Sequence, residues 1–299
     1  MDQIRIVFLG TSAGMPSRTR NVAAVAVVMD GRVLLFDCGE GTQQQLLRCE
    51  QVRSGGIEAI FITHLHGDHL FGLPGLLSSL GLGGRRDPLI VYGPPGLAAY
   101  LRATPYLNLA YELQVIEIEA GEVRRGSGYR VRCAPVVHHA RCFAYRVDED
   151  DRPGKFDAAK ARALGVPAGP AFGALQRGED WANVRSADVV GPPRRGRSIV
   201  YCTDTRPCDS AIELARDAHV LIHESTYDAS LSEEAMARDH STATEAAGVA
   251  RDAGVERLIL THISPRYESS DALVDEARLV FAQTDAASDF AVFEVPRGD

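Results

Sequence analysis

Residues 63–69 read Thr-His-Leu-His-Gly-Asp-His, and this motif constrains the chain more than any other stretch. It directly follows an apolar, β-branched run that predicts a buried strand. Neutral imidazole and carboxylate are the ligands that zinc and similar divalent ions prefer. A tight loop can turn successive side chains toward two neighbouring ions. We therefore predict that His64 and His66 bind one ion and that Asp68 and His69 bind the other.

A site for two ions needs further ligands, and the ends of later predicted strands supply them. His138 and His139 follow one apolar run, Asp204 follows a second and His262 follows a third. Each lies where a strand is expected to enter a loop, the usual location of functional groups on an α/β scaffold. Together with the first motif, this placement predicts Asp204 as the bridging carboxylate and His262 as a ligand of the second ion.

The pattern of apolar runs and turn residues predicts an α/β chain of the α+β type. The first half is rich in hairpins, and the last third alternates strands with helices, so two sheets with helices on their outer faces would satisfy it. The predicted strands are 4–9, 22–29, 32–36, 59–63, 89–92, 114–118, 129–134, 142–147, 198–203, 220–223, 257–261 and 290–295. The predicted helices are 42–49, 72–79, 96–104, 209–215, 242–253 and 270–281.

Length and charge limit the class of protein. The 299 residues can bury a large core without disulfides. A net charge of −8 makes a generally basic RNA-coating protein unexpected, although positive charge concentrated in one place would still suit a nucleic-acid enzyme. No apolar run reaches the ~18 residues of a membrane span. With no N-terminal signal pattern and no Cys-x-x-Cys pair, we expect a reduced, cytoplasmic protein without a membrane partner.

The segment 152–197 differs from the rest of the chain. It is rich in Pro and Gly and has nine basic and four acidic residues, hence a charge of +5 against −13 for the remainder. This composition favours an extended or mobile insertion over a packed sheet. A solvated linker is the alternative interpretation.

The spaced His and Asp residues resemble the metallo-β-lactamase superfamily, which implies an αββα sandwich with a two-metal site at one edge. Further segments narrow the resemblance to the ribonuclease Z family, the tRNA 3′-processing endonucleases, in its short form. They span nearly the whole chain in the family's order and lie at 8–16, 20–21, 36–43, 142–146, 203–207, 223–227, 240–242 and 261–267.

The resemblance also implies roles for single residues. Counting back from Tyr145 at the family's spacing selects His138 over His139 as a metal ligand, although Ala144 stands where the family usually has Gly. Glu224 and His240 would form a hydrogen-bonded pair near the scissile bond. His240 could instead help to begin the helix that starts with the Ser-Thr pair after it. By strand alternation we expect His223 to be structural.

The family's architecture implies one domain over 1–299, in which 152–197 protrudes as an arm that binds tRNA. In the family the arm reaches tRNA bound mainly by the other subunit, which implies a homodimer. The implied substrate contacts are Lys155, Lys160, Arg162, Arg194, Arg195 and Arg197 in the arm, Arg18 and Arg20 in the loop 14–21, and Thr242.

The implied reaction is cleavage of the 3′ trailer from precursor tRNA. Two divalent ions, Zn²⁺ or Mn²⁺, would activate a bridging hydroxide for attack on phosphorus. Asp68 would act as ligand and as orienter or base for the water, and His240 would protonate the leaving 3′-oxygen. The products are a 3′-hydroxyl on the tRNA and a 5′-phosphate on the trailer. The alternatives are a small-molecule phosphodiesterase or thioesterase of the same superfamily, and a non-catalytic tRNA-binding protein.

Overall fold

The computed structural model describes residues 3–105 and 107–297. These residues form two compact units. One unit holds the chain up to Val147 together with Ser198–Pro296, and the other holds Asp148–Arg197 and Arg297. Each unit has its own apolar core.

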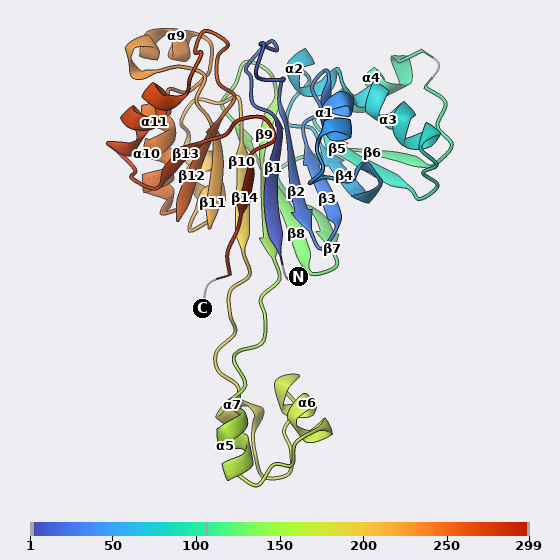
Figure 1. Cartoon of the computed structure of the whole chain (residues 1–299), viewed down its shortest axis with the longest axis vertical. Helices are drawn as coiled ribbons and strands as arrows, with labels where there is room; N and C mark the ends of the chain where they lie inside the picture. The colour runs from blue at the N-terminus through green and yellow to red at the C-terminus, as the bar shows by residue number, and fades with distance from the viewer. Residues whose placement is uncertain (1–2, 106, 298–299) are drawn as a thin grey trace. The chain divides into compact units, whose positions relative to one another are not determined.

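Two sheets form the centre of the larger unit, and helices cover their outer faces (Figure 1). Within the described residues the first sheet runs in the order β14 (Val292–Glu294), β1 (Ile4–Gly10), β2 (Ala24–Met29), β3 (Arg32–Phe36), β4 (Ile57–Phe61), β5 (Leu89–Gly93) and β6 (Leu113–Glu117). Pairing is antiparallel from β14 to β3 and parallel from β3 to β6.

The second sheet contains most of the chain's later strands. Its order is β13 (Thr284–Ala286), β12 (Arg257–Thr261), β11 (Val220–Glu224), β10 (Ser198–Cys202), β9 (Cys142–Glu149), β8 (Tyr129–Val136) and β7 (Gly121–Gly126). The strands from β10 to β13 are parallel, whereas β7 and β8 form an antiparallel hairpin. The carboxyl ends of β10, β11 and β12 therefore lie at one edge of the sheet.

The helices bury the outer face of each sheet. On the first sheet these are α1 (Thr42–Arg48), α3 (Leu73–Leu82) and α4 (Leu97–Ala103), and on the second α8 (Asp209–Ala215), α10 (Ala243–Ala253) and α11 (Asp271–Arg278). Shorter elements are η1 (Ser54–Gly56), α2 (Gly67–Leu70), η2 (Ala229–Leu231) and α9 (Ser232–Ala237). Among the described residues, none of the helices has the length and apolar character needed to cross a membrane.

Side-chain alternation explains why the strands are almost continuously apolar. Along β1, Ile6 and Phe8 face the second sheet, while Val7 and Leu9 pack under the helices. Both faces of the strand are thus buried, as expected for a sheet covered on two sides. The predicted αββα sandwich is confirmed by this layering.

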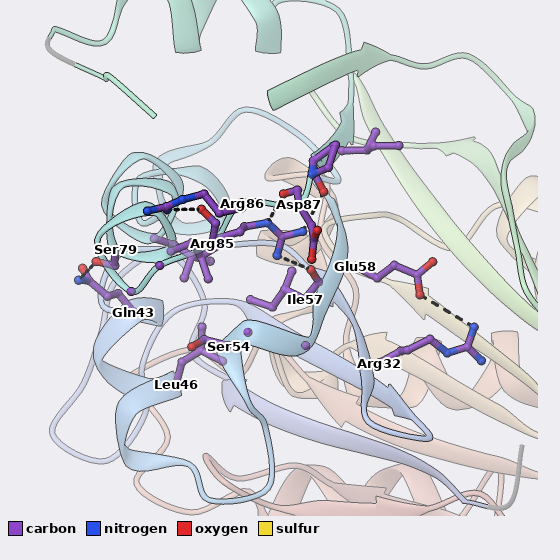
Figure 2. Close-up of a pocket in the computed structure, with 18 of the residues that line it drawn as sticks. Arg32, Gln43, Leu46, Ser54, Ile57, Glu58, Ser79, Arg85, Arg86 and Asp87 are labelled. Atoms are coloured by element: carbon purple, nitrogen blue, oxygen red, sulfur yellow. Dashed lines mark hydrogen bonds and ion pairs between the residues drawn. The ribbon is translucent and has the colours of Figure 1, made fainter. Parts of the chain in front are cut away.

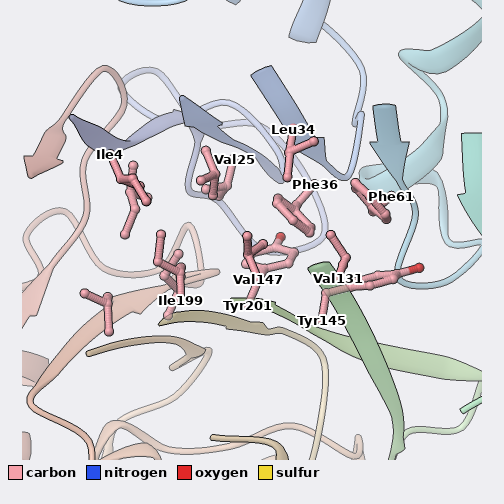
Figure 3. Packing of buried hydrophobic residues seen from close by; sticks show 14 of the residues in the cluster. Ile4, Val25, Leu34, Phe36, Phe61, Val131, Tyr145, Val147, Ile199 and Tyr201 are labelled. Atoms are coloured by element: carbon pink, nitrogen blue, oxygen red, sulfur yellow. The ribbon is translucent and has the colours of Figure 1, made fainter. Parts of the chain in front are cut away.

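Aromatic rings fill the space between the two sheets (Figure 3). The Phe61 ring stacks on Phe36 at 5.1 Å and on Tyr92 at 5.0 Å between centroids. The Tyr145 ring lies 5.4 Å from Phe61, and its hydroxyl donates to the Ile62 carbonyl over 2.7 Å. This cluster therefore fixes the end of β4, from which the chain enters the 63–69 motif.

Several elements were not predicted from the sequence. They are β7, β13, α2 and α9, each short or poor in apolar residues. The strand β7 reads Gly-Glu-Val-Arg-Arg-Gly and forms the edge of its sheet, where its polar side chains are partly exposed. An edge strand needs little apolar patterning, so its sequence resembles a loop.

The smaller unit contains three short helices, although its composition favoured an extended or mobile segment. They are α5 (Ala158–Ala163), α6 (Pro170–Gln176) and α7 (Ser186–Val189). Ala161, Leu175 and Val189 form its buried core, and Phe156 packs edge-on against Phe172 at 4.9 Å. Small apolar residues spaced among the Pro and Gly are therefore sufficient for local packing.

We expect Phe61→Ala to lower the free energy of unfolding by about 3–5 kcal/mol, because it leaves a cavity among stacked rings. Urea denaturation measures the change. Ile116→Ala on β6 is the matched control, since that side chain is 40% exposed and its loss should cost under about 1 kcal/mol. Equal losses for the two variants would contradict a core centred on these rings.

Candidate metal centre

The predicted ligands come together where the strands end. His64 and His66 follow β4, and the single turn of α2 then contains Asp68 and His69. The remaining residues come from the second sheet, with His138 after β8, Asp204 after β10 and His262 after β12. Both sheets therefore contribute to one site.

One group of ligand atoms consists of three imidazoles and a carboxylate. His64 Nε2 lies 2.9 Å from His66 Nδ1, which lies 3.4 Å from His138 Nε2. Asp204 Oδ2 lies 3.6 Å from His64 Nε2 and 4.0 Å from His138 Nε2. Four candidate donors thus surround one point from different elements.

A second group uses the other oxygen of Asp204. Its Oδ1 atom lies 3.2 Å from both His69 Nε2 and His262 Nε2. Asp68 Oδ2 lies 3.3 Å and 3.4 Å from the same two nitrogens. One carboxylate therefore faces both groups with separate oxygens, which is the arrangement a bridging ligand requires.

The spacing of these atoms fits small divalent ions. Ligand bonds of about 2.0–2.1 Å place neighbouring donors of a tetrahedral zinc ion roughly 3.3 Å apart. In the first group, and among Asp68, His69 and His262 in the second, the donor atoms all lie within 4.8 Å of one another. The nitrogen and oxygen donors also suit zinc or manganese better than softer ions.

Backbone strain marks the same positions. Asp37, Asp204 and His262 have φ values of 57°, 48° and 53°. Non-glycine residues adopt this left-handed conformation at a cost of about 1–2 kcal/mol each. Asp37 and His262 directly follow β3 and β12, and Asp204 lies two residues after β10, so each side chain turns toward the site as the chain leaves its sheet.

In four of these histidines the Nδ1 atom, which is not the candidate ligand atom, lies within hydrogen-bond distance of another group. His69 Nδ1 lies 2.8 Å from Asp37 Oδ2, and His262 Nδ1 lies 3.0 Å from Thr226 Oγ1. His64 Nδ1 meets the hydroxyl of the preceding threonine at 3.0 Å, and His138 Nδ1 meets the Asp239 carbonyl at 3.1 Å. Such contacts fix the ring orientation and tautomer of metal-binding histidines.

Asp37 was not predicted as a functional residue. Its carboxylate accepts from the Thr63 amide at 2.8 Å and from the Tyr201 hydroxyl at 3.0 Å, besides contacting His69. An acidic residue directly after a buried strand was the available signal. It was missed because Asp37 contacts a ligand and faces neither ligand group directly.

The electrostatics of the two groups differ. Burial lowers the pKa of His64 well below its ordinary value, which leaves a neutral imidazole able to bind a cation. Burial acts in the same direction on His69, but the carboxylates of Asp204, Asp68 and Asp37 outweigh it and raise that pKa. The second group therefore concentrates negative charge that a divalent cation would neutralise.

Glu224 and His240 form a pair beside the ligands. Fully buried Glu224 lies with Oε1 2.9 Å from His240 Nδ1. Burial favours a neutral imidazole, yet the Glu224 carboxylate raises the pKa of His240 to about 9. The His240 ring also lies 5.6 Å from the His262 ring between centroids. An imidazole whose protonated form is favoured by Glu224 therefore lies next to the second ligand group.

The Glu224 carboxylate also joins neighbouring loops. It accepts from the amides of Thr205 at 2.6 Å and Ser241 at 3.1 Å, and from the Thr226 hydroxyl at 2.6 Å. Thr205 follows Asp204 and Ser241 follows His240, while the Thr226 hydroxyl lies 3.0 Å from His262 Nδ1. The buried Glu224 carboxylate stays ionised because several donors surround it, and its hydrogen bonds hold the loops at Thr205, Thr226 and Ser241 against one another.

The two adjacent histidines have different positions. The structure brings His138 into the first ligand group and leaves His139 outside it. The His139 ring contacts the rings of His66 and His138 at 4.7 Å and 4.1 Å between centroids. His223, expected to be structural, is buried and its Nδ1 donates to the Glu224 backbone carbonyl over 2.8 Å.

The predicted substrate contacts of the larger unit differ in exposure. Arg18 is exposed, but Arg20 is half-buried and donates to the Thr11 hydroxyl and the Ala287 carbonyl. Thr242 is buried, and its hydroxyl accepts from the Glu245 amide as the N-cap of α10. The internal bonds of Arg20 and Thr242 give both residues structural roles.

The six predicted substrate contacts of the smaller unit also differ in exposure. Lys155, Lys160, Arg162 and Arg195 are exposed. Arg197 is buried in a bidentate ion pair with Glu149, at 2.7 Å and 2.9 Å. The remaining one, Arg194, is half-buried and donates to the Pro153 carbonyl over 3.3 Å.

A cavity of about 960 Å³ lies away from the ligands (Figure 2). It contacts Ile57 at the start of β4, whereas the histidines follow the end of that strand. The guanidinium of Arg85 lines it but donates to the carbonyls of Ile57, Asp87 and Pro88. We do not assign the reactive site to this cavity, despite its volume, because none of the metal-ligand residues lines it.

Comparison with known proteins agrees with this geometry. Residues 32–263 match the family described as the beta-lactamase superfamily domain. Ribonuclease Z of Acaryochloris marina is 48% identical over 309 aligned positions, covering 98% of each chain. Ribonuclease Z of a Picosynechococcus species is also 48% identical, covering 98% of this chain and 97% of its own.

A solved structure extends the likeness to three dimensions. The crystal structure of human tRNase Z, short form, matches with a TM-score of 0.72 and 29% identity, covering 98% of this chain and 99% of the human one. Sequence identity near one half over the full length accompanies a shared fold and the metal-ligand motif. This chain belongs to the ribonuclease Z family of the metallo-β-lactamase superfamily, a family of metal-dependent endoribonucleases.

Proposed function

We propose that this chain removes the 3′ trailer from precursor tRNA, leaving a 3′-hydroxyl on the tRNA and a 5′-phosphate on the trailer. The observation that supports this proposal most directly is the pair of ligand groups that share Asp204, with Glu224 and His240 beside them. The names of the curated relatives and of the human structure point to the same substrate.

The proposal includes two divalent ions per chain, Zn²⁺ with Mn²⁺ as the other candidate. His64, His66 and His138 would bind the first ion, Asp68, His69 and His262 the second, and Asp204 both. When bound, the ions would lower the pKa of a water molecule between them and neutralise charge on the phosphate oxygens.

The chain's own residues would then orient the reaction. Asp68 would orient the water and accept its proton. Glu224 would keep Nδ1 of His240 protonated, so that Nε2 can donate a proton to the leaving 3′-oxygen. An alkoxide is a poor leaving group, and its protonation is the step that this pair would provide.

We further propose that the domain over 1–299 has an arm at 152–197 that binds tRNA phosphates outside the reactive site. Arm side chains would contact the backbone without reading bases. The arm's +5 charge supports this role, and Lys155, Lys160, Arg162 and Arg195 are among its exposed cations. As in the family, the active form would be a cytoplasmic homodimer whose arm reaches tRNA on the other subunit.

The alternative hydrolases of the superfamily share the ligand set. A small-molecule phosphodiesterase or thioesterase would not need a basic arm of this length, so the arm favours a large anionic substrate. A non-catalytic tRNA-binding protein would not need the Glu224–His240 pair.

Asp68→Ala should lower the rate of trailer cleavage by about 10²–10⁴-fold, because it removes a ligand and the group that orients the water. The measurement is cleavage of a 3′-extended tRNA precursor, with the cut mapped at single-nucleotide resolution. Asp87→Ala, an exposed aspartate at the cavity in Figure 2, is the control and should cleave at the wild-type rate. Full cleavage by Asp68→Ala would exclude the proposed mechanism.

Replacing residues 155–190 with a short Gly-Ser link should raise KM for precursor tRNA about tenfold or more, since phosphate contacts dominate such affinity. The link can close the chain because the backbones of Gly154 and Gly191 lie in contact. Hydrolysis of bis(p-nitrophenyl) phosphate, which needs no arm, should continue at the wild-type rate. Equal loss on both substrates would assign these residues to the fold or the reactive site instead.

Asp37→Asn should weaken Zn²⁺ binding about 10–100-fold, because it removes the carboxylate that orients His69. Competition with a chromogenic chelator measures the affinity in the absence of RNA. Asp285→Asn, which alters a surface ion pair with Arg257, is the matched control. Zn²⁺ affinity that stays at the wild-type value in a folded Asp37→Asn protein would contradict this role.

A further inference from the structure

The loop 11–21 touches the metal centre through one backbone bond. The Gly14 amide donates to Asp68 Oδ2 over 2.9 Å. The same oxygen lies 3.3 Å from His69 Nε2 and 3.4 Å from His262 Nε2. The hydrogen bond therefore ends on the Asp68 oxygen that faces His69 and His262, its neighbours in the second ligand group.

The first limb of this loop is attached next to a ligand. The Ile263 amide donates to the Thr11 carbonyl over 2.9 Å, and the Ala13 amide donates to the Ile263 carbonyl over 3.1 Å. Ser12 lies between Thr11 and Ala13 and forms isolated β-bridges with Ile263 on one side and with Val22 on the other. Its hydroxyl donates to the Met15 carbonyl over 2.7 Å, which closes the turn that contains Gly14.

Asp289 joins the two ends of the loop. Its Oδ1 atom accepts from the Thr11 hydroxyl at 2.8 Å, and its Oδ2 atom accepts from the Asn21 amide at 2.7 Å. Gln45 Nε2 of α1 donates to the same Oδ2 at 2.8 Å. Because Thr11 begins the loop and Asn21 ends it, one carboxylate sets the distance between its limbs.

Arg20 strengthens the same junction. Its guanidinium donates to the Thr11 hydroxyl at 2.8 Å and to the Ala287 carbonyl at 2.7 Å. The side chain thus connects the second limb of the loop to the first and to the segment that contains Asp289. These bonds occupy the base of the loop, while its tip at Gly14 is exposed and reaches Asp68.

We propose that Asp289 is a positioning residue of the metal centre, and that it acts through the loop 11–21 and the Gly14 amide on the carboxylate of Asp68. The inference rests on the two-metal centre of the proposed function. A hydrogen bond to a ligating carboxylate limits its rotation and favours its charged form.

The test is Asp289→Asn. The carboxylate accepts hydrogen bonds on both oxygens, from Thr11, Asn21 and Gln45, whereas an amide has one oxygen and an NH₂ group that would face a donor. We expect Zn²⁺ affinity to fall about tenfold in a chelator competition without RNA. Trypsin should cut after the exposed Arg18 faster than in the wild type. With precursor tRNA, kcat should fall while KM stays the same. Unchanged Zn²⁺ affinity in a protein whose loop is cut faster would overturn the proposal.

Gly14→Ala tests the tip of the loop without altering its base. Nothing lies within 4 Å of an added Cβ, but φ is +69°, which an L side chain rarely adopts. The variant should still fold, with Tm lowered by about 2–4 °C at most because the strain is confined to the loop. It should still lose Zn²⁺ affinity, which keeps the proposal testable if Asp289→Asn fails to fold. Wild-type Zn²⁺ affinity in Gly14→Ala would count against the proposal.

Glu117→Gln is the matched control, since Glu117 also accepts from backbone amides, those of Gly96 and Ala98. It should retain wild-type Zn²⁺ affinity and tryptic cleavage, and an equal loss here would refute a specific role for Asp289. The Zn²⁺ comparison is independent of RNA. A wild-type protein that fails to cleave precursor tRNA would therefore contradict the proposed function alone.

Discussion

The carboxylate of Asp204 is the contact on which the site depends. Its two oxygens face different ligand groups, and its neighbours are the imidazoles of His64, His69 and His262. Burial disfavours the charged carboxylate, but these imidazoles outweigh it and lower the pKa of Asp204. The backbone conformation at φ 48° aims the side chain at both groups at once. Losing this carboxylate would leave the first ligand group with imidazoles alone.

The sequence predicted that these side chains would come together, because their placement follows a local rule. A buried strand that ends in His or Asp places that side chain at the edge of a sheet, and this holds for Asp204 and His262 as it does for residues 63–69. The layered fold followed from the alternation of strands and helices. Asp37 also follows a buried strand, but its contact with His69 is visible only in the fold. Asp289 belongs to no such pattern, and its partners Thr11 and Asn21 are distant in sequence.

The smaller unit shows where composition misleads. The formal charge of +5 over residues 152–197 treats every cation as available, but Arg197 is buried against Glu149, and Arg177 and Arg185 pair with neighbouring carboxylates. Its Pro and Gly content favoured an extended chain, whereas alanine, leucine and valine side chains form a small core. Exposed surface pairs contribute little stability, so Arg177 and Arg185 can exchange their partners for phosphate.

The site also depends on the packing between the sheets. His64 and His69 come from the first sheet, while Asp204 and His262 come from the second, so neither sheet alone holds a complete ligand group. The rings between the sheets therefore set the distance between the ligands as well as the stability of the core. Because an ion that binds only the assembled site stabilises the folded state, metal binding and sheet packing should reinforce each other. This coupling gives the metal a structural effect in addition to its chemistry.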